Sequence, residues 1–152
     1  MTDPTPLRES IEIAASPAAV WAVVSDVRRM PDFSPELRKV VLLGRKTGAG
    51  ANLLGINRRG LVIWPTTSKV VRWEPERAIA WKTRESGATW LYELVSSGSR
   101  SGTTLTGSRI LPRFTMGTTL LGPVIGGAAG HDAELADGIR TTLQRIKAVL
   151  ER

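Results

Sequence analysis

The last 22 residues of the chain carry apolar side chains at helical spacing. Successive members are three or four residues apart and so fall on one stripe of an α-helix: Leu135, Ile139, Leu143, Ile146 and Leu150. The polar residues between them are expected mostly on the other side, facing water: Arg140, Gln144, Arg145, Lys147 and Arg152. The pattern predicts one amphipathic helix over His131–Arg152. Such a stripe needs a large apolar surface to cover it.

The preceding hundred residues alternate apolar and polar positions with a period of two, which is typical of half-buried strands. Seven strands are predicted, over Glu9–Ala14, Lys39–Leu43, Ala51–Arg58, Val62–Trp73, Ala78–Thr83, Thr89–Val95 and Thr103–Leu111. Short Gly-, Ser- or Pro-containing connections join most of them. Such connections favour antiparallel pairing of neighbours along the chain.

A helix is predicted directly after the first strand. Ser16 is a good N-cap residue, and Pro17 suits the first helical position. The helix is expected over Pro17–Val27 and to end at Met30-Pro31, because the residue before proline avoids helical geometry. At most one further short helical turn follows, over Pro31–Glu36. Strands with two short helices after the first and a long helix at the end define an α+β fold.

Residues Leu111–Gly130 fit neither pattern. The segment is apolar but is interrupted by five glycines and two prolines. A connection of this length is unusual in a compact domain, and such connections are often functional. Two interpretations stay open: a mobile flap over a pocket, or an extended, frayed start of the terminal helix.

Length and composition predict one globular domain. With 152 residues the chain can bury a core without disulfides. Residues 1–8 are interpreted as a flexible tail and residues 9–152 as the domain. The chain has no cysteine and only His131 as histidine, which excludes thiolate and multi-histidine metal sites. No cofactor is expected. A cytoplasmic location is the default expectation, since neither a signal pattern nor an apolar run of about 20 residues is present.

The net charge of +7 raises nucleic acid as a partner. The basic residues are spread along the chain, with pairs only at places such as Arg28-Arg29 and Arg58-Arg59. No basic stripe stands next to stacking aromatic residues, which argues against nucleic acid and for a solvated basic outer face. Binding of nucleic acid or protein by this face is kept as a third alternative.

The chain contains several local motifs: Ser16-Pro17-Ala18-Ala19-Val20-Trp21, Ser25-Asp26-Val27, Met30-Pro31-Asp32-Phe33-Ser34-Pro35-Glu36, Gly55-Ile56-Asn57-Arg58-Arg59-Gly60, Trp73-Glu74-Pro75, Trp90-Leu91-Tyr92-Glu93-Leu94 and Thr141-Thr142-Leu143-Gln144-Arg145-Ile146-Lys147. Together they resemble polyketide cyclase/dehydrase-type members of the START-like (SRPBCC), helix-grip superfamily. The resemblance covers nearly the whole chain. It implies a bent antiparallel sheet of about seven strands wrapped around the long C-terminal helix. It also implies an apolar cavity between sheet and helix for lipids, polyketides or other hydrophobic molecules. Fold alone does not define activity.

Ligand-binding candidates come from the aromatic and apolar positions. Four of the five tryptophans fall in predicted strands, where rings with a polar edge could line a cavity or fill the core. The predicted ligand-binding residues are Asn57, Trp64, Trp81, Trp90, Tyr92, Phe114, Met116, Leu120, Leu135 and Ile139.

Candidates for acid–base chemistry are few. Tyr92 and Arg109 lie in strands, where an inward side chain could polarise a ligand carbonyl and an outward one would be solvated. His131 could titrate near neutral pH or merely cap the helix. The leading hypothesis is therefore a binding protein for a hydrophobic small molecule. The alternative is a polyketide aromatase/cyclase or dehydrase. A monomer and a homodimer are both compatible with the sequence.

Overall fold

A computed structural model of the chain describes residues 7–97, 102–111 and 128–152, with side chains described from residue 135 onward in the last range. The elements are β1 (Leu7–Ile13), α1 (Pro17–Val24), the 3-10 helix η1 (Val27–Asp32), β2 (Leu37–Leu43), β3 (Asn52–Arg59), β4 (Val62–Glu74), β5 (Ala78–Thr83), β6 (Thr89–Ser96), β7 (Thr103–Ile110) and α3 (Ala128–Leu150). The predicted strands are confirmed, with ends that differ by one or two residues. β1 begins at Leu7, two residues before the predicted start.

All seven strands form one antiparallel sheet in the order β1-β7-β6-β5-β4-β3-β2. Successive strands from β2 to β7 are neighbours, as the short connections predicted. β1 instead pairs with β7, which brings Leu7 opposite Arg109 and Ile13 opposite Thr103. The first strand thus joins the last one, and α3 follows at the same edge. This is the α+β helix-grip arrangement.

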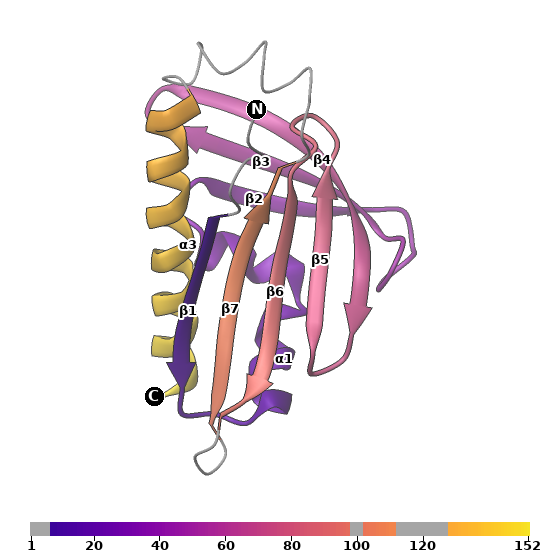
Figure 1. Cartoon of the computed structure of the whole chain (residues 1–152). Helices are drawn as coiled ribbons and strands as arrows, with labels where there is room; N and C mark the ends of the chain where they lie inside the picture. The colour runs from indigo at the N-terminus through magenta and orange to yellow at the C-terminus, as the bar shows by residue number, and fades with distance from the viewer. Residues whose placement is uncertain (1–6, 98–101, 112–127) are drawn as a thin grey trace.

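The sheet bends within its longest strand, β4. The first part of β4 pairs with β3 and the last part with β5. Figure 1 shows the first part crossing the molecule with β3 and β2, and the last part running beside β5. A bulge between Val70 and Arg72 accompanies the bend. The bulge changes the alternation, so that Trp73 pairs with Ile79 and shares a face with Val70. Uninterrupted alternation over Val62–Trp73 had placed these two residues on opposite faces.

Two helical segments follow β1, as predicted, but their boundaries differ. Ser16 caps α1, since its Oγ accepts a hydrogen bond from the Ala19 amide at 3.2 Å. The prediction that α1 continues to Val27 is wrong, because α1 ends at Val24. The prediction of a second turn over Pro31–Glu36 is also wrong: η1 spans Val27–Asp32 and runs through Met30-Pro31 instead of ending there. The tighter 3-10 turn brings both Val27 and Met30 into the core.

The terminal helix α3 starts at Ala128, three residues earlier than predicted. It lies along β1 at the edge of the sheet (Figure 1) and also contacts β7. Four residues of its predicted apolar stripe are buried, and the fifth, Leu150, is partly buried. Residues 112–127, which make up most of the segment with two interpretations, lie outside the described residues.

Polar bonds fasten α3 to β1. Arg140 binds the Glu9 carboxylate at 2.7 Å, and Lys147 Nζ donates to the Glu12 carbonyl oxygen at 2.8 Å. On the other side of the helix, Arg145 donates to the Phe33 carbonyl oxygen at 3.2 Å. Arg140 and Arg145 are exposed, as expected, and Lys147 is half-buried. Their long stems span the edge of the apolar stripe and reach acceptors on neighbouring segments.

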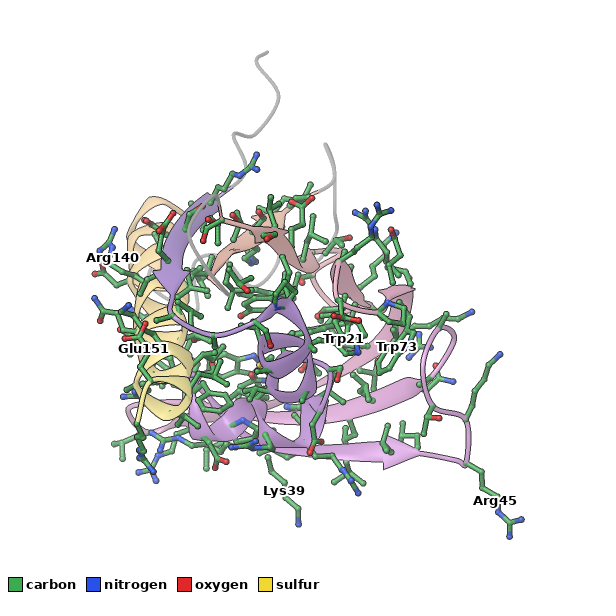
Figure 2. All side chains as sticks on the ribbon, turned by 90° about the horizontal axis from the view of Figure 1, so that it is seen from below. Trp21, Lys39, Arg45, Trp73, Arg140 and Glu151 are labelled. Carbon is green, nitrogen blue, oxygen red and sulfur yellow. The ribbon has the colours of Figure 1, made fainter. Side chains whose placement is uncertain are left out.

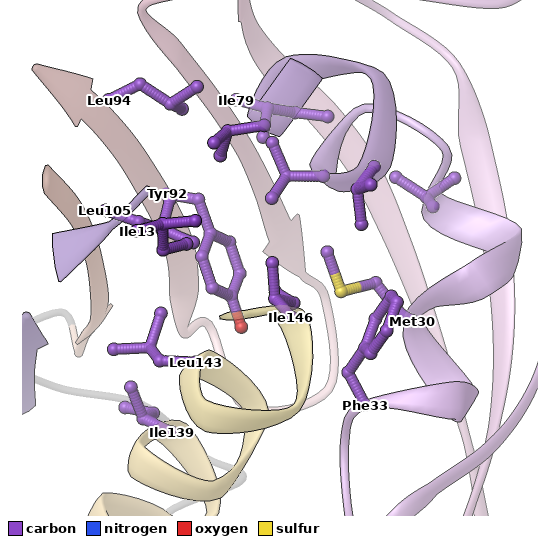
Figure 3. Close-up of a cluster of buried hydrophobic side chains, with 14 of the residues drawn as sticks. Ile13, Met30, Phe33, Ile79, Tyr92, Leu94, Leu105, Ile139, Leu143 and Ile146 are labelled. Carbon is purple, nitrogen blue, oxygen red and sulfur yellow. The ribbon is translucent and has the colours of Figure 1, made fainter. Parts of the chain in front are cut away.

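The core lies between the sheet and the helices (Figure 3). Trp21 of α1 and Trp73 meet edge-on, with ring centroids 5.2 Å apart and a 76° angle between the planes. They lie beside each other in Figure 2. Both tryptophans are half-buried and pack against the core. Among the described residues, no helix is long and apolar enough to cross a membrane.

Candidate ligand-binding face

The inner face of the sheet, which packs against α1, η1 and α3, carries most of the candidate residues. In the strand register Trp81 stands opposite Trp90, and Trp90 stands opposite Arg109. Tyr92 lies two residues from Trp90 on the same strand. Directly paired residues and residues two apart share a face. We call these four the aromatic row: Trp81, Trp90, Tyr92 and Arg109.

The aromatic row is held together by ring contacts. Trp81 and Tyr92 stack, with centroids 5.7 Å apart and planes inclined by 28°. The Arg109 guanidinium lies over the Trp90 ring, 5.5 Å from its centroid, which is within cation–π range. Trp81, Trp90 and Arg109 are half-buried, whereas Tyr92 is buried. The row therefore runs from the buried core toward a less enclosed part of the inner face.

Gly107 gives Tyr92 and α3 room to meet. A Cβ atom at Gly107 would lie 3.0 Å from Ile139 Cγ2 and 3.1 Å from Tyr92 Cε1, closer than ordinary contact allows. The Tyr92 ring points from β6 toward α3 (Figure 3). Burial raises the pKa of the Tyr92 phenol. Tyr92 is thus protonated at neutral pH, and its hydroxyl can donate a hydrogen bond.

Hydroxyl and amide groups continue the inner face along β4. Ser68 and Thr83, both buried, share a hydrogen bond of 3.0 Å between their hydroxyl oxygens. Farther along, Asn57 Nδ2 donates to Thr66 Oγ1 at 3.0 Å and to the Trp64 carbonyl oxygen at 3.3 Å. The amide nitrogen of Asn57 thus braces the β3–β4 pair.

The predicted ligand-binding residues fall into two groups. Trp81, Trp90 and Tyr92 lie together, and Leu135 and Ile139 are buried on α3. Asn57 and Trp64 form a separate pair, four residues along β4 from Ser68, or about 13 Å. The remaining candidates lie outside the described residues or have undescribed side chains: Phe114, Met116, Leu120 and His131.

Two residues that sequence reasoning missed shape this face. Thr83 stands opposite Ser68, at the end of a strand whose other inward residues are apolar. Gly107 interrupts an otherwise regular strand, and an isolated glycine in a strand is a signal of close approach. The sequence does not show which residues approach Gly107, because Tyr92 and Ile139 lie on other elements.

The described residues contain no group of three His, Asp or Glu side chains that could hold a metal ion. The inner face instead combines aromatic rings, hydroxyl groups and one guanidinium. Such a set can bind a ring or an acyl chain and orient an oxygen atom of it.

The family described as "polyketide cyclase / dehydrase and lipid transport" matches this chain over residues 5–151. The chain therefore belongs to this family, a polyketide cyclase/dehydrase-type branch of the START-like proteins. No curated protein matches the sequence at a significant level.

Several solved structures share the fold. The Zhui aromatase/cyclase from Streptomyces sp. R1128 has a TM-score of 0.73 at 18% identity, covering 97% of this chain and 94% of that one. One di-domain aromatase/cyclase of the steffimycin biosynthetic pathway has a TM-score of 0.72 at 16% identity, covering 96% and 50%. At these identities the likeness concerns the fold. A polyketide-cyclase-like protein from Corynebacterium glutamicum is 28% identical, with a TM-score of 0.62 and coverage of 96% and 91%.

Proposed function

We propose that this protein binds a hydrophobic small molecule, with a ring system or acyl chain, between the aromatic row and the N-terminal half of α3. The observation that carries the proposal is the half-buried state of Trp81, Trp90 and Arg109 on the face that the helices cover. The Trp21–Trp73 pair is also half-buried, but its two rings pack edge-on against each other.

The chemistry of the row favours a ligand with both apolar and oxygen-bearing parts. Stacked aromatic rings offer flat faces for a second ring system or a chain. Arg109 carries a permanent positive charge and would attract a carbonyl, phenolate or carboxylate oxygen. The Tyr92 hydroxyl would add a neutral donor. We expect the apolar part to lie along Trp81 and Trp90, with its oxygen near Arg109.

A second candidate function is cyclisation of a polyketide chain. It is favoured by the family and by the position of Arg109 beside Tyr92 on one face. The Arg109 guanidinium could stabilise the enolate oxygen of an aldol step, and the shape of the binding face could hold the polyketide chain in a folded conformation. Such a step also needs a base. Glu9, which the register puts on the inner face opposite Gly107, is bound to Arg140. The binding role is therefore preferred.

A thermal-shift panel tests the binding role. It would use oleate as an acyl chain and emodin as a fused-ring, oxygen-bearing compound. A ligand at 100 times its dissociation constant should add roughly 2.7 kcal/mol to the free energy of unfolding. Trp90→Leu should reduce the shift, while Lys82→Ala, an exposed change on β5, should not. No shift with either compound would contradict the proposal.

The cyclase candidate is tested separately with a linear poly-β-ketone thioester mimic. A cyclised, dehydrated product that forms faster with the protein than without it would support catalysis, and Arg109→Met should abolish that difference. Binding of the mimic without rate enhancement would leave the protein a binder only.

A further inference from the structure

The β3–β4 hairpin ends in a tight, braced tip. Only Gly60 and Leu61 connect the strands, and Gly60 has a φ of 60°, which glycine adopts without strain. Arg58 Nε donates to the Gly60 carbonyl oxygen at 2.9 Å. The Asn57 amide bonds to Thr66 and to the Trp64 carbonyl support the hairpin behind the tip. The tip therefore holds its shape.

This tip carries an unusual concentration of exposed apolar side chains. Leu61 is 95% exposed, Val62 45% and Ile63 64%. Eight large apolar side chains are exposed in the described part of the chain, and these three are consecutive. Scattered exposed apolar residues need no explanation, but a group of them at one hairpin tip marks a contact site.

Basic residues surround the apolar tip. Arg58 stands directly opposite Ile63 in the hairpin, and Arg59 stands opposite Val62. On the neighbouring strand Lys39 pairs with Ile56, two residues before Arg58. Arg58 and Lys39 are exposed and share the outer face. Lys39 points away from the body of the molecule in Figure 2. The acidic residue Glu36 directly precedes β2, and its carbonyl oxygen accepts a hydrogen bond from the Arg58 amide.

We propose that the β3–β4 hairpin docks the protein onto the surface of an anionic phospholipid bilayer. Leu61 and Ile63 would enter the boundary between headgroups and acyl chains, and Arg58 and Lys39 would lie among the lipid phosphates. Exposed aliphatic side chains next to basic residues favour a lipid surface over nucleic acid as the partner. Aliphatic side chains make no favourable contact with a phosphate backbone, and the tip has no aromatic ring on which a base could stack. This inference goes beyond the proposed ligand binding and does not depend on it.

Co-sedimentation with vesicles tests the proposal. The full chain would be mixed with phosphatidylcholine vesicles that contain or lack phosphatidylglycerol, at low and moderate salt. The double variant Leu61→Ser/Ile63→Ser should lower the partition coefficient at least tenfold, the order expected for removing one leucine side chain from the interface. Arg58→Gln should lower it about fivefold.

Two controls match these variants at other places. Val95→Ser removes a side chain as exposed as Ile63, since both are 64% exposed, from a different strand. Arg45→Gln removes the same charge beyond the opposite end of β2, where Arg45 projects outward (Figure 2). Both controls should bind anionic vesicles like the unaltered protein. Circular dichroism would verify that every variant is folded.

Three outcomes would overturn the proposal. The unaltered protein could fail to bind anionic vesicles at low salt. Arg45→Gln could weaken binding as much as Arg58→Gln, which would indicate attraction by net charge alone. The serine double variant could bind anionic vesicles as well as the unaltered protein, which would indicate that the apolar tip contacts a protein partner instead of lipid.

Discussion

Arg109 lies over the ring of Trp90, directly across the β6–β7 pair, with 5.5 Å between the guanidinium carbon and the ring centroid. The contact fixes a positive charge on the inner face beside flat apolar surface. If the Arg109 guanidinium donates a hydrogen bond to an oxygen of the ligand, the free energy that this bond contributes to binding depends on whether the oxygen is charged. A hydrogen bond to a charged group contributes about 1.5–3 kcal/mol.

Arg109→Met should therefore weaken binding of oleate about 10- to 100-fold. Binding of oleyl alcohol, which has the same chain and no charge, should change little. Titration of both compounds by isothermal calorimetry measures the difference. Equal losses for the acid and the alcohol would mean that Arg109 only supports the Trp90 ring.

Gly107→Ala should destabilise the fold by about 1–3 kcal/mol, because the new methyl group would press against Tyr92 and Ile139. Gly138 provides the matched control. Gly138 lies in α3, and a Cβ there would meet Pro35 at 3.6 Å, an ordinary contact, so Gly138→Ala should stabilise by about 0.5–1 kcal/mol through helix propensity. Urea unfolding of both variants checks the opposite signs. An unchanged free energy of unfolding for Gly107→Ala would show that the sheet and α3 can move apart easily at this position.

The apolar stripe of α3 should be costly to truncate. Leu143 and Ile146 are 1% and 0% exposed, so Leu143→Ala or Ile146→Ala should each cost about 2–5 kcal/mol through lost burial and a residual void. Gln144→Ala, at an exposed position between them, should stay within about 0.5 kcal/mol. Similarly small changes in the free energy of unfolding for all three variants would contradict the conclusion that packing of α3 against the sheet edge stabilises the fold.

Glu85 should make stability depend on pH. Burial alone would raise the pKa of its carboxyl, but hydrogen bonds from the Thr67 hydroxyl and amide, at 2.7 and 2.6 Å, hold that pKa below its usual value. A lowered folded pKa stabilises the fold above the unfolded value of about 4.3, and the contribution disappears as pH falls through the folded pKa.

The melting temperature of the unaltered protein should therefore fall more steeply below about pH 4.3 than that of Glu85→Gln. Melting curves from pH 7 to pH 3 measure both slopes. Identical slopes would mean that the carboxylate bonds to Thr67 contribute no net stability.

The elements of the fold were predictable from local patterns. The terminal stripe and the alternating strands follow from burial of one face, and Ser16-Pro17 starts α1 by capping chemistry. Features that depend on partners far apart in sequence were not. The bulge that turns Trp73 inward arises where β4 changes partner from β3 to β5. Likewise, Arg140, Arg145 and Lys147 found acceptors on segments more than 100 residues away.

The candidate site was predictable only in part. Tyr92 and Arg109 were recognised as possible inward residues, but β5 is apolar at three successive positions, Ala78 to Ala80, so its alternation did not reveal the direction of Trp81. Pairing with β6 decides it, because Trp81 stands opposite Trp90. Asn57 and Trp64 were grouped with these residues by residue type, and the distance along β4 separates them.

The five tryptophans offer the most direct test of the central claim, that a hydrophobic ligand binds at the aromatic row. Each indole N–H gives its own signal in a ¹⁵N–¹H spectrum, and single Trp→Phe variants would assign them. Addition of oleate or emodin should shift the signals of Trp81 and Trp90. The signals of Trp21 and Trp73, whose rings pack against each other, should stay unchanged. Shifts confined to Trp21 and Trp73, equal shifts of all five, or no shift with either compound would contradict the claim.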